Sequence, residues 1–244
     1  MNTKKTIHTS RTIMFSELAS LMDHAIQDDN YLDSLSQNVI NKKTNSGIKK
    51  TTGYLTALYG FDSTYPPFKA LKYFWGFSDE QDKPILAFLY AIGHDYLLAE
   101  SIPVVMDSKL GYKVSIDKFE LNIESFYPNR FSENTRKSLS QNIASSWKQA
   151  GFITGKVKNI RTQPRISYQV VAFALFMAYL DGLRGDFLMT SPCIKALSLS
   201  DSVIRDLTVE AAKRDLLQYQ FAGSVTAISF NNLITKLEID GFQD

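Results

Sequence analysis

The stretch that decides the fold class is YQVVAFALFMAYL, residues Tyr168–Leu180 of a chain of 244 residues. Gln169 is its one strongly polar residue, and Asp181 follows it directly. A helix that is apolar on every side lies in a protein core or in a membrane. A membrane-spanning helix needs about 20 apolar residues. This shorter stretch therefore predicts a helix buried at the centre of a core, and we expect no membrane-spanning segment.

A second helix is indicated earlier in the chain. Ser132 is a favourable N-cap residue, and Glu133 stands at the positive end of the expected helix dipole. Leu139, Ile143 and Trp147 follow at four-residue spacing, which places them on one helical face. Similar spacing recurs through most of the chain. We therefore predict a mainly α fold, a helical bundle with helix-turn-helix or winged-helix-like parts.

Three segments depart from helical periodicity. Phe152–Arg165 is polar and basic and contains glycine and proline, which predicts a loop or a short hairpin. Ser224–Phe230 alternates apolar and small residues, which predicts a short C-terminal β element. Ile102–Tyr112 is ambiguous, because its apolar run fits either a short strand or a buried loop.

The expected domain organisation follows the order of the chain. Three short amphipathic stretches fill the first part, and Ser46 is the expected cap of the third. Pro66 and Pro67 favour an extended link and a boundary. We expect an N-terminal trihelical, helix-turn-helix-like unit over residues 1–62, a helical middle segment over 63–126, and a winged-helix-like helical domain over 127–244.

Motifs that carry catalysis are missing from the sequence. His8, His24 and His94 do not stand at metal-ligand spacing from one another or from Cys193. Neither a glycine-rich phosphate loop nor a nucleophile elbow occurs. We therefore expect a protein that is not an enzyme, with no metal site and no cofactor. The single cysteine and the polar N-terminus without an apolar signal run favour a cytoplasmic protein.

One fragment leaves a nuclease open as an alternative. Asp107-Ser108-Lys109 follows the apolar run Ile102–Met106. Metal-dependent nucleases often end a strand with an acid and a lysine two residues later, where the carboxylate holds a divalent ion. The same three residues also fit an ordinary polar turn before Gly111.

The charge of the chain is unevenly distributed. The net charge is +2, yet residues 130–165 hold eight basic residues and one acid, Glu133. That window therefore carries +7, and the rest of the chain carries −5. The basic residues of the window are Arg130, Arg136, Lys137, Lys148, Lys156, Lys158, Arg161 and Arg165.

A basic helix followed by a basic loop is typical of a winged helix-turn-helix that binds duplex DNA. Asn134, Gln141 and Asn142 could reach base edges, because side-chain amides pair with adenine. We expect phosphate contacts of first rank from seven of the eight basic residues: Arg136, Lys137, Lys148, Lys156, Lys158, Arg161 and Arg165. A smaller cluster supplies contacts of second rank: Lys42, Lys43, Lys49 and Lys50.

The same charge pattern fits other partners. A basic face can be a solvated surface, or it can dock an acidic protein, which would make the chain an adaptor or scaffold subunit. An RNA-binding helical factor is a third hypothesis, and preference for single-stranded or hairpin RNA over duplex DNA would distinguish it.

Two patches of the sequence resemble a known family. The segment FSENTRKSLSQNIASSWKQAGFI, residues Phe131–Ile153, looks like the S-x-x-T-R…L…A-G-hydrophobic stretch of the BrxA proteins of BREX phage-exclusion systems. Residues Asn38–Thr44, NVINKKT, stand where that family has an N-x-hydrophobic-x-K-x-S/T element. In layout the resemblance covers about two thirds of the chain, and in identity it covers these two short patches.

The resemblance carries expectations about fold and role. It implies an all-helical protein with helix-turn-helix-like parts that binds DNA without a cofactor. It also implies a part in bacterial antiviral defence, as a small non-enzymatic component beside a methyltransferase, an ATPase and a phosphatase-like protein. The partners expected on this basis are double-stranded DNA and other BREX proteins, with no membrane.

Overall fold

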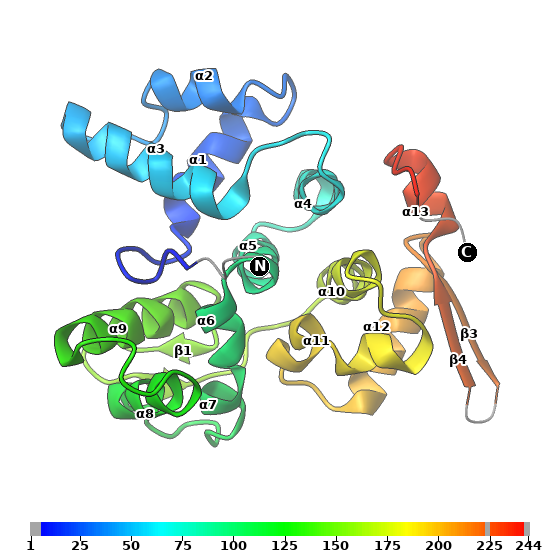
Figure 1. Cartoon of the computed structure of the whole chain (residues 1–244). Helices are drawn as coiled ribbons and strands as arrows, with labels where there is room; N and C mark the ends of the chain where they lie inside the picture. Colours follow the sequence, from blue (N-terminus) through cyan, green and yellow to red (C-terminus); the bar gives the residue numbers. More distant parts are fainter. Residues whose placement is uncertain (1–5, 223–224, 242–244) are drawn as a thin grey trace. The chain divides into compact units, whose positions relative to one another are not determined.

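The predicted mainly α fold is confirmed. A computed structural model describes residues 6–222 and 225–241 (Figure 1). Helices dominate that part of the chain, together with two small antiparallel sheets of two strands each. One sheet lies near the C-terminus, where the sequence predicts a β element.

The chain forms two compact units. Unit 1 contains Met1–Phe61 and Tyr90–Pro164, and unit 2 contains Asp62–Leu89 and Arg165–Asp244. The chain passes between them inside helix α5 (Lys83–His94). Each unit is therefore built from two separate stretches of sequence.

Three helices open unit 1: α1 (Phe15–Ala25), α2 (Tyr31–Ser36) and α3 (Asn45–Tyr59). Their buried faces bring aromatic rings together, and Tyr31 stacks on Phe61 with ring centroids 5.5 Å apart. The cap of α3 is Thr44, whose hydroxyl accepts the Gly47 N–H at 3.0 Å. The predicted cap, Ser46, lies inside the helix instead.

The second part of unit 1 continues from α5 with four helices and a hairpin. The elements are α6 (Tyr96–Glu100), α7 (Ile102–Met106), α8 (Ile116–Phe126), α9 (Glu133–Gln149), β1 (Ile153–Thr154) and β2 (Ile160–Arg161). Ile102–Tyr112 begins with a helix, so both the strand and the loop interpretation were wrong for its first half. Pro103 favours this outcome, because proline fits the first turn of a helix. The short hairpin predicted within Phe152–Arg165 is confirmed.

Helix α9 has the face that its spacing predicts. Leu139, Ile143 and Trp147 are fully buried. The indole N–H of Trp147 donates to Ser101 Oγ at 2.8 Å, which satisfies its polar atom in the core. At the N-terminus, Ser132 Oγ accepts the Thr135 N–H at 3.3 Å, as expected of the predicted cap.

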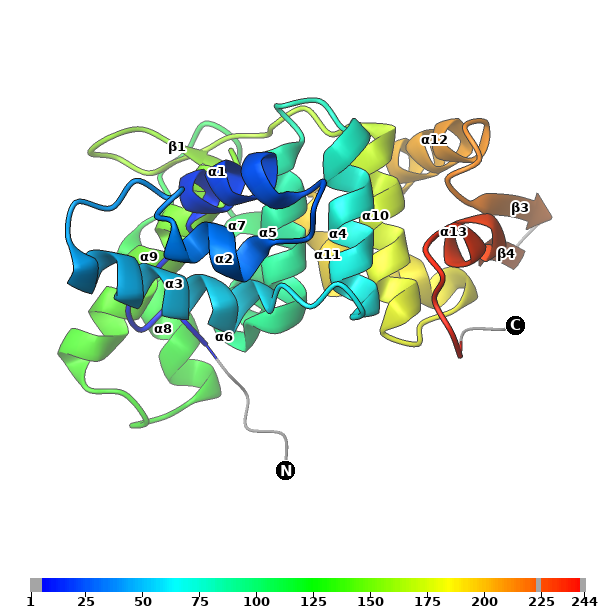
Figure 2. The same cartoon turned by 90° about the horizontal axis from the view of Figure 1, so that it is seen from above.

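Unit 2 contains the apolar helix Tyr168–Leu180, which the sequence predicts to be buried. Its elements are α4 (Pro66–Phe77), the first half of α5, α10 (Tyr168–Leu180), the 3-10 helix η1 (Gly185–Thr190), α11 (Pro192–Ala196), α12 (Asp201–Ala212), β3 (Gln218–Ala222), β4 (Val225–Ser229) and α13 (Asn231–Lys236). Residues 169–179 of α10 are buried. Figure 2 shows α4 alongside α10, and Phe74 meets Phe173 there at 5.4 Å between ring centroids.

Two features of unit 2 refine the sequence expectations. Pro66 and Pro67 form the first turn of α4, so the predicted extended link was wrong. Residues 225–229 form β4, which pairs with β3 and confirms most of the predicted C-terminal strand. Gly223 and Ser224 lie outside the described residues.

No single helix in the described part of the chain is long and apolar enough to cross a membrane. Lys83–His94 and Tyr96–Met106 reach the required length and apolar composition only as a pair, and that pair is bent by 103° at its break.

A buried carboxyl marks the start of α5. Asp82 is 1% exposed, and its Oδ2 accepts the Ser167 hydroxyl at 2.7 Å. Its Oδ1 has no partner among the described residues. Burial raises the pKa of Asp82 above its ordinary value, although the Ser167 bond and the Arg165 charge oppose the rise. Folding therefore favours the protonated carboxyl.

We predict that Asp82→Asn stabilises the protein at pH 7 relative to wild type. Asparagine keeps an oxygen for Ser167 but carries no buried charge. Because the folded pKa of Asp82 is raised, the stability from its protonation is present at low pH and is lost as pH rises through the folded pKa. The advantage of Asp82→Asn should therefore grow from pH 4 to pH 7 in urea unfolding. A constant difference would contradict the prediction.

Candidate nucleic-acid interface

The second part of unit 1 has the element order of a winged helix-turn-helix. After α7, residues 111–114 pair with the strand that ends the hairpin. The Gly111 N–H donates to Arg161 O at 2.9 Å, and the Val114 N–H donates to Asn159 O at 2.8 Å. Lys113 and Ile160 form an antiparallel bridge between these segments. We call residues 109–114 together with 153–161 the wing.

Helix α9 occupies the place of a recognition helix within this arrangement. Its face opposite the core carries exposed polar side chains: Asn134, Lys137, Ser138 and Gln141. These residues recur at three- and four-residue spacing, so they share one side of the helix. Lys148 is the next-to-last residue of α9 and is half-buried.

Arg161 has a different role from the predicted phosphate contact. Its side chain is 1% exposed. Its Nε donates to Val105 O at 3.1 Å, and its Nη1 donates to Phe152 O at 3.2 Å and also to Thr162 O. Burial lowers the pKa of this guanidinium below its ordinary value. The phosphate role was wrong, because the guanidinium is enclosed in the protein and bonded to backbone carbonyls.

Two further basic side chains of the window are engaged inside unit 1. Arg136 is half-buried and pairs with Glu124 on α8 at 2.6 Å. The guanidinium of Arg130 lies over the rings of Tyr127 and Phe131, at 5.1 and 5.4 Å from their centroids. A guanidinium that is paired with a carboxylate or stacked on aromatic rings is less available to bind a phosphate than the ammonium of an unpaired lysine is.

Two other predicted contacts lie outside unit 1 or are already engaged. Arg165 is exposed and belongs to unit 2, whereas the other first-rank residues belong to unit 1. The amide of Asn142 donates to His8 O at 2.8 Å, which assigns it to holding the N-terminal segment rather than to reading bases.

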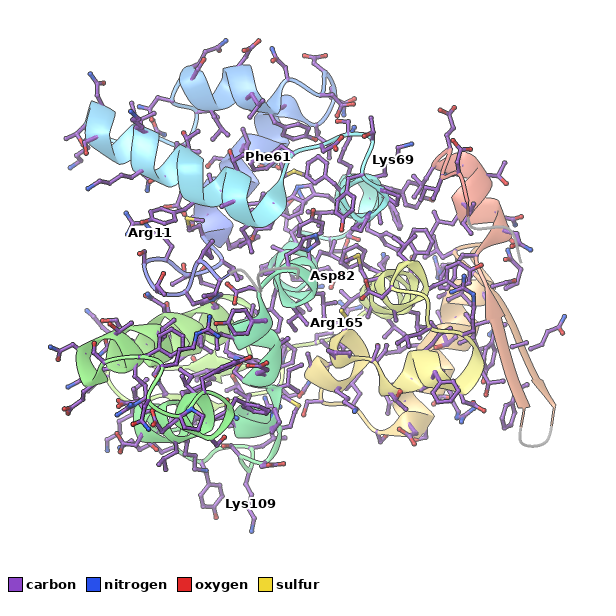
Figure 3. All side chains as sticks on the ribbon, viewed as in Figure 1. Arg11, Phe61, Lys69, Asp82, Lys109 and Arg165 are labelled. Atoms are coloured by element: carbon purple, nitrogen blue, oxygen red, sulfur yellow. The ribbon has the colours of Figure 1, made fainter. Side chains whose placement is uncertain are left out.

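Lysines of the wing complete the candidate surface. Lys156 and Lys158 are exposed on the hairpin, as predicted. The sequence window missed Lys109 and Lys113, which are also exposed. The pairing of residues 111–114 with β2 brings them beside the hairpin, although nearly 50 residues separate them from it in sequence. Figure 3 shows Lys109 pointing outward from its unit.

Net charge differs between the two units. Unit 1 contains 17 basic and 12 acidic residues, a balance of +5. Unit 2 contains 10 basic and 13 acidic residues, a balance of −3. The candidate DNA-binding surface therefore lies on the unit whose charge attracts an anionic partner.

The second-rank cluster lies around the start of α3. Lys42 pairs with Glu17 at 2.6 Å, whereas Lys43 is exposed. Lys49 and Lys50 are exposed and line a groove of about 490 Å³ along α3. The other lining residues are Ser46, Gly53, Tyr54 and Ala57.

A buried polar relay ties the N-terminal segment to α9, and sequence reasoning missed it. His8 Nδ1 lies 2.8 Å from Asp95 Oδ2, and His8 Nε2 lies 2.8 Å from Ser146 Oγ. Asp95 Oδ2 also accepts the Ile7 N–H at 2.8 Å. Burial alone would raise the pKa of Asp95, but the His8 charge and the bonds to its carboxylate outweigh burial and hold this pKa below its ordinary value.

Asp95, His8 and Ser146 are bonded in the order of the acid, histidine and serine of a hydrolase triad, but they are not accessible to a substrate. His8 and Ser146 are 0% exposed, and Asp95 is 1% exposed. Ser146 Oγ already accepts the Ile13 N–H at 3.0 Å and donates to Asn142 O at 3.1 Å. These contacts fit a clamp that fixes the N-terminal segment on α9.

The geometry gives no support to the nuclease alternative. Asp107 follows the five-residue helix α7, whereas the nuclease pattern needs a carboxylate at the end of a strand. Among the described residues, His, Cys, Asp and Glu side chains form no cluster of three that could hold a metal ion.

Cys193 is buried, and burial together with the Asp181 charge raises its pKa to about 12.

Comparisons with known proteins add no relative: no protein-family model, no curated protein and no solved structure matches this chain.

We predict that Arg161→Ala lowers the free energy of unfolding by about 3 kcal/mol, because it leaves buried carbonyls without their donor. Lys158→Ala, a neighbouring cation that is exposed, should change it by less than about 0.5 kcal/mol. Urea unfolding of both variants checks the contrast. Wild-type stability of Arg161→Ala would show that its carbonyl bonds contribute little.

We also predict that Asp95→Asn destabilises the protein at pH 7, because it weakens the relay. The folded pKa of Asp95 lies below the ordinary value of 3.8. Its contribution is therefore present above that pH and is lost as pH falls through the folded pKa. Unfolding at pH 7 and pH 3 should show a smaller difference from wild type at pH 3. Asp33→Asn, at an exposed position on α2, is the matched control.

Proposed function

We propose that this protein binds double-stranded DNA without catalysing a reaction, through α9 and the wing of unit 1. The observation that carries the proposal is the combination of an exposed polar face on α9 with lysines on the adjoining wing. A duplex presents a dense line of phosphate charge, and proteins bind it with grouped lysine and arginine side chains.

The roles divide between base contact and phosphate contact. Helix α9 is of a size that enters the major groove, and Asn134 and Gln141 on its exposed face can pair with adenine. Lys137 and Lys148 on the same helix are the residues that we expect to contact phosphates. The wing supplies further phosphate contacts through four exposed lysines: Lys109, Lys113, Lys156 and Lys158.

The α3 groove is a second contact in this proposal. Lys49 and Lys50 line it, and the Arg11 guanidinium lies 4.9 Å from the centroid of the Tyr54 ring. Lys43 is exposed just before the helix. These cations are suited to the sugar–phosphate backbone, which is contacted without regard to sequence.

The biological setting that we propose is bacterial antiviral defence. The two patches that resemble BrxA proteins lie in the proposed contact regions: Phe131–Ile153 covers α9 and reaches β1, and Asn38–Thr44 leads into α3. The protein would act in the cytoplasm as an accessory component of a BREX system, alongside other BREX proteins and without a cofactor.

A docking role for a protein partner is the second candidate. Unit 2 has a groove of about 330 Å³ whose lining includes Met189, Ile194 and Phe221. Beside this groove, Phe187 and Phe221 are 71% and 53% exposed, and the Arg205 guanidinium lies 4.7 Å from the centroid of the Phe221 ring. A stable complex with a protein that survives loss of the wing lysines but not Phe221→Ser would favour this candidate.

We predict that duplex DNA binding weakens steeply with salt. Each phosphate contact contributes about 0.9 to the slope of log affinity against log salt concentration. Replacing Lys137, Lys156 and Lys158 together by alanine should lower that slope by about three units. Fluorescence anisotropy with a labelled duplex over a salt series measures this.

Two comparisons make the outcome decisive. Lys195→Ala removes an exposed lysine of unit 2 and should leave the slope unchanged. An unchanged slope in the triple variant would refute the wing and α9 as the binding surface. Tighter binding of single-stranded or hairpin RNA than of duplex DNA would favour the RNA-binding alternative instead.

A further inference from the structure

The groove of unit 2 combines an apolar lining with two carboxylates. It holds about 330 Å³, and its apolar lining residues are Met189, Ile194, Ile204 and Phe221. Asp186 and Asp201 also line it, both are exposed, and no ion pair in the described part of the chain includes them. The groove is therefore suited to an apolar side chain that has cations beside it.

The basic residue of the lining, Arg205, is already engaged. Its guanidinium carbon lies 4.7 Å from the centroid of the Phe221 ring, and its Nη1 donates to Thr226 Oγ1 at 3.4 Å. Arg205 thus connects α12 to β3 and β4 instead of pairing with the two aspartates. Unpaired carboxylates repel phosphates, so the groove disfavours nucleic acid and favours a cationic segment of a protein.

One segment of this same chain has the matching chemistry. Val157 is 92% exposed, the largest value among the exposed large hydrophobic residues of the described ranges. Within that set it is also the one residue with a basic neighbour on each side, Lys156 and Lys158, which are both exposed. We call these three residues the wing tip.

The wing tip is held in a defined conformation. Gly155 has a φ of +95°, and a Cβ at that position would clash with Lys158 O. Only glycine fits this turn without displacing the backbone. On the other side of Val157, Asn159 O accepts the Val114 N–H at 2.8 Å. A tip that is anchored on both sides loses less conformational freedom when it binds.

We propose that the wing tip of one copy of this chain docks in the unit 2 groove of a second copy. Val157 contacts the apolar lining, and the two lysines pair with Asp186 and Asp201. The groove is larger than one valine side chain, so the methylene stems of the lysines fill the rest while their ammonium groups stay at the rim. Unit 1 carries +5 and unit 2 carries −3, which favours the same pairing at long range.

The proposed contact joins two different surfaces of the chain. It is therefore heterologous, and it can extend beyond a dimer. The contact is also small, so the association is weak and reversible. Lys156 and Lys158 are proposed phosphate contacts as well, so duplex DNA competes with the contact between copies. That competition rests on the proposed function, whereas the contact between copies does not.

Sedimentation velocity measures the association. We expect wild-type protein to associate reversibly as its concentration rises from about 1 μM to about 1 mM. Val157→Ser should raise the dissociation constant about tenfold, because it removes the apolar contact. Added salt should weaken the association, because the paired charges lie near the surface. Wild-type protein that stays monomeric over the whole range would overturn the proposal.

Two variants that do not associate alone should associate when mixed. The groove variant, Asp186→Lys with Asp201→Lys, keeps the wild-type tip. The tip variant, Lys156→Glu with Lys158→Glu, keeps the wild-type groove. Each should stay monomeric alone, because like charges meet at its contact. An equimolar mixture should associate at least as strongly as wild type, and this recovery would also show that both variants are folded.

The matched control for the groove variant is Asp206→Lys, which changes an exposed aspartate of α12 that does not line the groove. It should associate as wild type does. Association of the groove variant alone, or a mixture that stays monomeric, would overturn the contact. If wild-type protein is monomeric and its groove instead retains a different protein that Phe221→Ser releases, the groove belongs to another partner and the proposal is wrong.

The contact between copies and the proposed function fail separately. Duplex DNA should dissociate the wild-type assemblies, because it takes up the lysines of the wing tip. Recovery on mixing without any salt-dependent duplex binding would refute the proposed function and leave the contact between copies in place. Duplex binding with a mixture that stays monomeric would do the reverse.

Discussion

The guanidinium of Arg161 is the interaction on which the candidate interface depends. The guanidinium donates to Val105 O in α7 and to Phe152 O just before β1. The backbone carbonyl of the same residue accepts the Gly111 N–H, and its backbone N–H donates to Tyr112 O. One side chain therefore connects the helix, the hairpin and the segment that pairs with it. A charged group is retained in this buried position because carbonyl oxygens surround it. Through this connection the two strands of the wing that carry the exposed lysines are joined to α7.

A second buried polar centre fixes the other side of α9. His8 contacts both Asp95 and Ser146, so a residue near the start of the chain joins the beginning of α6 to α9. The helix is thus held by apolar packing through Trp147 and by directional polar bonds through Ser146. Polar bonds of this kind specify one orientation of a helix, whereas apolar packing alone tolerates several. The proposed DNA-binding role of α9 requires a single orientation, because base contacts depend on position.

Local pattern predicted the helices well and the interface only in part. The buried face of α9 followed from the spacing of its apolar residues, and the burial of α10 followed from its being apolar on every side. The hairpin followed from glycine and proline. The charge window could not show that Arg161 is buried, because burial depends on carbonyls brought there by α7. It also omitted Lys109 and Lys113, since strand pairing over long sequence separation leaves no local signal. His8 was unremarkable in sequence for the same reason: its partners are 87 and 138 positions away.

The discontinuous make-up of unit 1 has a consequence for how the protein is made. During synthesis, Met1–Phe61 leaves the ribosome well before Tyr90–Pro164, which completes the same unit. The N-terminal helices must therefore wait, with part of their surface uncovered, while all of α4 and most of α5 is translated. Contacts over such sequence distances slow folding and lengthen the time in which a chain can associate wrongly. Unit 1 therefore cannot complete its core until residue 164 has emerged from the ribosome.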